Sequence, residues 1–179
     1  MPQSKKYFEE VQYFDQLWLK LLMLSVFLMS IVPLYYITIK QIITGIPVGD
    51  KPMSTTGLIV TDLLVTLIVG GSVLLVFFLK LKTVITSEGI FVQFKPFVNG
   101  RLIRPHEIEH WEVRKYNPVK EYGGWGYRFG SGKKGTAYNV KGNLGLQLVL
   151  NGNKRLLIGT QRPDAIKRAM EKLMYRTNE

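Results

Sequence analysis

Residues 57–79 read GLIVTDLLVTLIVGGSVLLVFFL, a membrane-length run in which Asp62 is the only charge. An earlier apolar run, residues 21–39, carries no charge at all. A helix rises about 1.5 Å per residue, so a run of this length spans roughly 28 Å, close to the hydrocarbon thickness of a bilayer. The segment between the two runs, residues 44–56, is rich in glycine and proline and is too short to be a domain.

These runs predict a transmembrane hairpin over residues 21–82, with spans at about 21–43 and 57–79. A cleaved signal peptide is the competing interpretation of the first run. It fits poorly, because the run is long, acidic residues precede it and no small-residue cleavage site follows it. In the second span we expect Asp62 to cap the helix at the outer interface or to contact the neighbouring helix, because it lies near the start of that span.

The net charge of the chain, +11, lies entirely after the second apolar run. Residues 1–79 hold five lysines and five acidic groups, whereas residues 80–179 hold 19 lysines and arginines against 8 acidic groups. The cations before the first span and after the second span are Lys5, Lys6, Lys20, Lys80 and Lys82. The positive-inside rule then predicts a multi-pass cell-membrane protein with both termini in the cytoplasm. The absence of cysteine agrees with a cytoplasmic domain that has no disulfides.

Residues 1–20 are predicted to be an N-terminal segment at the membrane interface. Apolar residues recur there at helical spacing, namely Tyr7, Phe8, Val11, Phe14, Leu17 and Trp18. Two interpretations stay open at this point. The segment is either an amphipathic helix lying on the membrane or an extension of the first span whose aromatic residues form an interfacial belt.

From residue 83 onward the apolar pattern has a period of two, which predicts a cytoplasmic domain over residues 83–179 that is rich in strands. The predicted strands cover residues 83–87, 90–97, 108–116, 125–129, 136–140, 144–150 and 155–159. Asn151 and Gly152 supply the hairpin turn between the last two, because both residue types tolerate positive φ.

After Arg162 the period changes to that of a helix. Pro163 and Asp164 suit a first helical turn, where a missing N–H costs little and an acid meets the positive end of the helix dipole. One face of the predicted helix is apolar and comprises Ile166, Ala169, Met170, Leu173 and Met174. The domain is therefore predicted to be α+β, with a bent antiparallel sheet closed by a C-terminal amphipathic helix.

Three motifs carry a resemblance to a known family. They are Glu121-Tyr122-Gly123-Gly124-Trp125-Gly126-Tyr127-Arg128, Ala137-Tyr138-Asn139-Val140 with Gly142, and Ile158-Gly159-Thr160-Gln161-Arg162-Pro163. With the order of elements, they resemble small two-pass bacterial membrane proteins that have a cytoplasmic pleckstrin-homology-like domain and no assigned activity. The resemblance implies a pleckstrin-homology-like antiparallel β-barrel or sandwich with a C-terminal capping helix over residues 83 to about 175. It implies no particular chemistry.

Residues His106-Glu107-Ile108-Glu109-His110 match the H-E-x-x-H pattern, in which two histidines on one helical face bind zinc. The alternative function is accordingly a zinc-dependent hydrolase that uses His106, Glu107 and His110. The pattern is more simply interpreted as the entry to a strand at Ile108, because side chains four residues apart diverge along a strand. We therefore expect no zinc, no other cofactor and no enzymatic activity.

The loop between Tyr116 and Arg128 is the candidate binding site, because it combines three glycines with large aromatic residues. The candidate binding residues are Tyr122, Gly123, Gly124, Trp125, Gly126, Tyr127, Arg128, Lys133 and Lys134. They would contact a ligand, a peptide or a lipid headgroup. In the competing interpretation the loop folds back and Trp125 plugs the end of the sheet.

The features together predict a membrane-anchored interaction module at the cytoplasmic leaflet. Its expected partners are the membrane lipids, a membrane-protein partner or a second copy of the chain. The basic domain is held at the anionic leaflet, where each nearby cation contributes about 1 kcal/mol. Nucleic acid is therefore not expected as a partner. A phosphoinositide site is not expected either, because the first turn of the domain, Ser87-Glu88-Gly89, is short.

Overall fold

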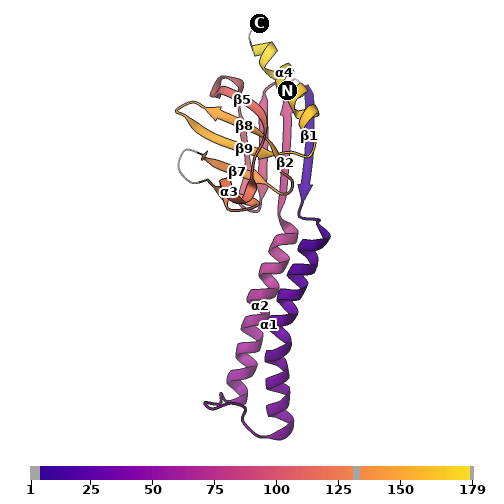
Figure 1. Ribbon diagram of the computed structural model, residues 1–179, viewed down its shortest axis with the longest axis vertical. Coiled ribbons are helices and arrows are strands. Elements are labelled where there is room, and N and C mark those ends of the chain that lie inside the picture. The colour runs from indigo at the N-terminus through magenta and orange to yellow at the C-terminus, as the bar shows by residue number, and fades with distance from the viewer. Residues whose placement is uncertain (1–4, 131–133, 178–179) are drawn as a thin grey trace. The chain divides into compact units, whose positions relative to one another are not determined.

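The computed structural model describes residues 5–130 and 134–177. The chain divides into a helical unit, Asp15–Phe78, and a β unit that runs from the N-terminus to Phe14 and from Leu79 onward. In the sequence, the helical unit is thus inserted between two segments of the β unit; Figure 1 colours the chain by residue number. The β unit is larger than the predicted cytoplasmic domain of residues 83–179, because it also includes the N-terminal segment and residues 79–82.

The helical unit consists of two antiparallel helices, α1 (Leu17–Thr44) and α2 (Thr55–Phe78). Both are long and apolar enough to cross a membrane, as predicted, and each begins a few residues earlier than expected. Gly45 ends α1 in the left-handed conformation, with φ of 67°, and its N–H donates to the carbonyl of Gln41.

Residues before the first long helix form a strand, β1 (Lys6–Tyr13), which differs from the predicted interfacial helix or helix extension. The strand pairs antiparallel with β2 (Lys80–Thr86). Its side chains alternate, and those of Phe8, Glu10 and Gln12 point into the β unit. Two of these three inward residues are polar, so the alternation is invisible to a hydrophobic pattern.

The β unit is an open sandwich of two sheets and not the closed barrel that was one of the predicted forms (Figure 1). The first sheet has the order β1-β2-β3-β4, with β3 at Gly89–Lys95 and β4 at Val98–Ile103. The second has the order β5-β8-β9-β7-β6. Its strands are β5 (Ile108–Lys115), β6 (Gly126–Phe129), β7 (Thr136–Asn139), β8 (Leu144–Leu150) and β9 (Lys154–Gly159). All pairs are antiparallel except β7 with β9.

The seven predicted strands are confirmed, whereas β1 and β4 were not predicted. The turn between β8 and β9 is also confirmed in position, but its positive-φ residues are Gly152 and Asn153, whereas Asn151 and Gly152 were predicted. The C-terminal helix, α4 (Pro163–Thr177), packs its apolar face on both sheets, so Ile166, Met170 and Leu173 are buried in the main core (Figure 1).

Candidate functional site

The predicted loop between Tyr116 and Arg128 contains a short helix, α3 (Pro118–Tyr122). Asn117 caps its N-terminus, because the side-chain oxygen accepts from the Lys120 N–H at 2.9 Å. Gly123 ends it with φ of 71°, a conformation in which a glycine avoids steric strain. The Asn117-Pro118 pair followed by Glu121 is a helix-start signal that the sequence contained. The loop is therefore a folded element of the β unit.

Tyr122, and not Trp125, is the buried aromatic ring of this loop, and it packs on the face of the second sheet opposite the main core. Only 3% of Tyr122 is exposed, and it belongs to a second small core with Tyr116, Ala137 and Leu157. Trp125 is half-buried, and its indole N–H donates to the carbonyl of Gly142 at 3.0 Å. The buried ring that the competing interpretation expected at Trp125 is therefore that of Tyr122. Trp125 is left with part of its ring on the surface.

A polar network holds α3 against the second sheet. The Arg114 guanidinium donates to the Glu121 carboxylate at 2.8 Å and to the Gln147 amide oxygen at 3.0 Å. The hydrogen bond from Arg114 lowers the pKa of Glu121. Burial is the largest single effect on Arg114 and lowers its pKa, but the hydrogen bond and the charge attraction of Glu121, together with the charges of Tyr122 and Glu112, outweigh burial and raise the pKa. These groups satisfy one another, so the network positions the loop.

The glycines of this motif adopt backbone conformations that favour glycine. Gly126 has φ of 118°, and its N–H donates to the Asn139 side-chain oxygen at 2.8 Å. The Asn139 amide in turn donates to the Tyr116 hydroxyl at 3.0 Å. Gly124, with φ of 125°, also has a backbone conformation that favours glycine. The path of the chain is therefore sufficient to explain glycine at these positions.

The remaining candidate residues are divided between the interior and the surface. Tyr127 is half-buried and Arg128 is exposed, with its Nε donating to the Trp125 carbonyl at 2.9 Å. Lys134 is half-buried, and its carbonyl accepts from the Tyr122 hydroxyl. Lys133 lies outside the described residues. Of the nine predicted residues, Trp125, Tyr127 and Arg128 offer the clearest outward contact.

An aromatic rim extends outward from the main core through Tyr127. We define it as Phe97, Tyr127 and Phe129, whose ring centroids lie 6.3 Å and 5.0 Å apart in that order. Phe97 is 56% exposed although it adjoins the buried ring of Phe94, and Phe129 is 71% exposed beside the half-buried ring of Tyr127. Phe97 was not among the predicted site residues. The sequence placed it at the end of the predicted strand 90–97, whereas β3 ends at Lys95 and Phe97 lies in the turn before β4.

Basic residues mark the same end of the first sheet as Phe97. Tyr13, Lys80 and Lys95 are paired across β1, β2 and β3, and the Lys80 ammonium lies 5.4 Å from the Tyr13 ring centroid. Phe97 follows Lys95 by two residues. Only Leu79 separates Lys80 from the end of α2. This row could not be predicted without β1, because the pairing partner of Lys80 was unknown.

The H-E-x-x-H residues do not share a helical face. His106 and Glu107 lie in a 3-10 turn, η1 (Pro105–Glu107), whereas His110 lies on β5. The predicted start of a strand at Ile108 is confirmed. Within residues 5–130 and 134–177, no group of three His, Cys, Asp or Glu side chains is placed to hold a metal ion.

Asp62 is buried between the two long helices and is only 3% exposed. Polar interhelical contacts lie on either side of it along the pair. Gln41 donates to the Thr55 hydroxyl at 3.2 Å, and the hydroxyls of Tyr35 and Thr66 are also 3.2 Å apart. Of the two expected roles for Asp62, this position corresponds to contact with the neighbouring helix.

Comparison with models of protein families, with curated proteins and with solved structures finds no match for this chain.

The network around Tyr116 predicts a loss of stability in alkaline solution. Burial raises the pKa of Tyr116 to about 12, whereas a tyrosine in an unfolded chain ionises near pH 10. The folded state therefore holds its proton more tightly, and this contribution, up to about 3 kcal/mol, is complete below pH 10 and is lost as the pH rises toward 12. Denaturant unfolding across this range measures the slope. Tyr116→Phe should reduce the slope, and an unchanged slope would contradict the assignment to Tyr116.

Proposed function

We propose that this protein is a membrane-anchored interaction module whose β unit contacts the anionic lipid surface of the cytoplasmic leaflet. The two long helices anchor it, with both termini in the cytoplasm. Support for the anchoring comes from their length and composition. Support for the placement of the termini comes from the basic residues near the start of α1 and the end of α2.

The observation that carries the proposal is the end of the first sheet formed by Lys80, Lys95 and Phe97. The chain leaves β1 for α1 and returns from α2 to β2, and the paired residues next to these connections are Tyr13 and Lys80. Residues so close in the chain to a membrane helix lie within reach of the headgroups. Lys95, which pairs with Lys80, and Phe97, two residues further along the chain, are both exposed.

The chemistry of this sheet end suits an anionic lipid surface. Each lysine near such a surface contributes about 1 kcal/mol, and an exposed aromatic ring prefers the boundary between headgroups and acyl chains. A protein partner within the membrane is the alternative, and the test below separates the two.

The pleckstrin-homology-like assignment belongs to this proposal. It is supported by the order of elements, in which mostly antiparallel strands precede a single C-terminal helix that packs on both sheets of an open sandwich. An interaction module fits this arrangement, because the loop residues pack in the β unit while aromatic and basic side chains are exposed on its surface.

The chain has no cysteine, so single cysteines can be placed without background labelling. In right-side-out membrane vesicles, Asp50→Cys should react with an impermeant maleimide. Lys167→Cys, on the exposed face of α4, should react only after permeabilisation. Labelling of Lys167→Cys from outside would overturn the topology.

Lipid contact is tested in the full-length protein reconstituted in nanodiscs. A polarity-sensitive dye on Phe97→Cys should report an apolar environment with anionic lipid, and the signal should weaken at high salt or with Lys95→Glu. The same dye on Lys167→Cys is the matched control and should remain in water. A dye on Phe97→Cys that stays in water with pure lipid but becomes apolar in native membranes would reject lipid and favour a protein partner.

A further inference from the structure

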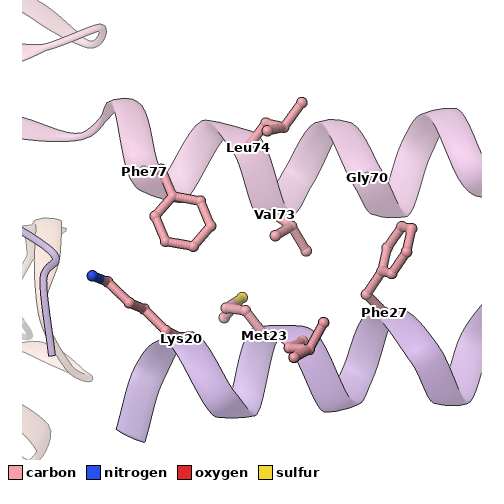
Figure 2. A pocket seen from close by; sticks show the side chains of 8 residues that line it. Lys20, Met23, Phe27, Gly70, Val73, Leu74 and Phe77 are labelled. Carbon is pink, nitrogen blue, oxygen red and sulfur yellow. The ribbon is translucent and has the colours of Figure 1, made fainter. Parts of the chain in front are cut away.

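A groove of about 360 Å³ lies between α1 and α2, within the helical unit. It is lined by the first turns of α1 and the last turns of α2. Figure 2 shows Lys20 and Phe77 at one end of the groove and Phe27 and Gly70 at the other. Of the eight residues that line it, Lys20 alone is charged and the others are apolar. The groove is therefore apolar along its length, with one cation at its end.

Gly70 opens the inner end of the groove. A Cβ atom built on Gly70 would lie 3.5 Å from the Phe27 ring, so a larger side chain there would fill the space between the helices. The adjacent Gly71 differs, because a Cβ atom built on it meets no atom within 4 Å. The two glycines thus provide a matched pair, one inside the groove and one outside it.

The dimensions favour a single extended chain over a helix as the occupant. From Lys20 to Phe27 the groove runs along two helical turns, roughly 10 Å. A helix with its side chains is at least about 10 Å wide, whereas the axes of two packed helices lie only about 8 to 10 Å apart, so a helix is too wide to enter the space between them. An acyl chain is narrow enough to enter.

The position of Lys20 favours an anionic headgroup. Lys20 lies in the first turn of α1, three residues after Leu17, where a transmembrane helix emerges from the hydrocarbon. A lysine there extends its ammonium toward the interface, at the depth of the lipid phosphates. An acyl chain in the groove would therefore bring its own phosphate to the Lys20 ammonium.

We propose that this groove binds one acyl chain of an anionic phospholipid, with the lipid phosphate held by Lys20. The lipid comes from the leaflet at which α1 begins and α2 ends. The site rests on the membrane anchoring in the proposed function, but it does not depend on the contact of Phe97 with lipid.

The test uses the full-length protein in bilayers of phosphatidylcholine with a minor fraction of spin-labelled lipid. Electron paramagnetic resonance measures the motionally restricted fraction of labelled phosphatidylglycerol and of labelled phosphatidylcholine. We expect Lys20 to contribute a preference for phosphatidylglycerol of about fivefold, the value that corresponds to one cation near the headgroups. Lys20→Gln should remove this contribution, whereas Lys40→Gln, at the opposite end of α1, should retain it. Any preference contributed by Lys80 and Lys95 should remain in both variants.

Gly70→Leu should reduce the restricted fraction of both lipids, and Gly71→Leu should not. Equal restriction of the two lipids by the wild type, or equal effects of Gly70→Leu and Gly71→Leu, would overturn the proposal. So would a change from oligomer to monomer in Gly70→Leu with an unchanged restricted fraction, because a second copy would then fill the groove. Lys95→Glu distinguishes the two sites, since it should weaken lipid contact at Phe97 and leave the effect of Gly70→Leu unchanged.

Discussion

A chain cut to residues 83–179 is expected not to fold, although it contains every strand that the period-two pattern predicts. It lacks β1 and the first three residues of β2. Leu81 is fully buried and Phe8 is 5% exposed in the main core. Removing a buried leucine or phenylalanine side chain costs about 2 to 5 kcal/mol. Together these losses approach the whole stability of a typical domain, which is about 5 to 15 kcal/mol.

Polar contacts add to the loss, because β1 also binds the turn before α4. The Glu10 carboxylate accepts from the Thr160 hydroxyl at 2.6 Å and from the Gln161 N–H at 2.8 Å. The Gln12 amide donates to the Gly159 carbonyl at 2.7 Å. Without β1 these buried groups lose their partners, which is costly in addition to the lost apolar contact.

A matched control keeps β1 and removes only the helices. Tyr13 and Lys80 are register partners, so an Asn-Gly pair inserted between them should close β1 and β2 as a hairpin. This shortened chain should be soluble, with a cooperative thermal transition and dispersed amide resonances. The chain of residues 83–179 should show neither. Cooperative unfolding of both chains with equal midpoints would contradict the role of β1.

How far the sequence predicts this fold depends on where each side chain finds its partners. The two long helices were predicted because their apolar runs need no tertiary partner to be recognised. The strand β8 was predicted because Leu144, Leu146, Leu148 and Leu150 alternate. The strand β1 was not, because Glu10 and Gln12 are buried by groups about 150 positions away in the chain. A local pattern contains no information about such partners.

The unusual backbone of the candidate loop was predicted from the sequence, but the packing of each residue in it was not. The glycines and aromatics around Trp125 identified a segment with special backbone demands, and positive φ at Gly126 bears this out. Which aromatic ring lies inside depends on the path of α3, and this placed Tyr122 in the small core. Phe97 was missed because its exposure follows from β4, a strand without an apolar alternation.

Tyr122→Ala is expected to destabilise the β unit by about 3 to 5 kcal/mol, the range for buried aromatic residues. The ring of Tyr122 packs edge-on against Tyr116 at 6.0 Å between centroids, and 3% of the residue is exposed. Its removal leaves a cavity beside Ala137 and Leu157, which lie on paired strands and cannot close it. Denaturant unfolding of the β unit in the full-length protein in detergent, followed by tryptophan fluorescence, measures the change.

Two further variants separate packing from contact. Tyr122→Phe keeps the ring and removes only the hydroxyl, which donates to the Lys134 carbonyl at 3.3 Å, so it should cost about 1 kcal/mol. Trp125→Ala should cost clearly less than Tyr122→Ala, because the half-buried indole loses one hydrogen bond and part of its contact area. If Trp125→Ala were the more damaging substitution, Trp125 and not Tyr122 would be the main packing residue of this loop on the second sheet. If the Trp125→Ala protein is stable, measuring its contact with lipid would show whether the exposed part of the indole contributes to that contact.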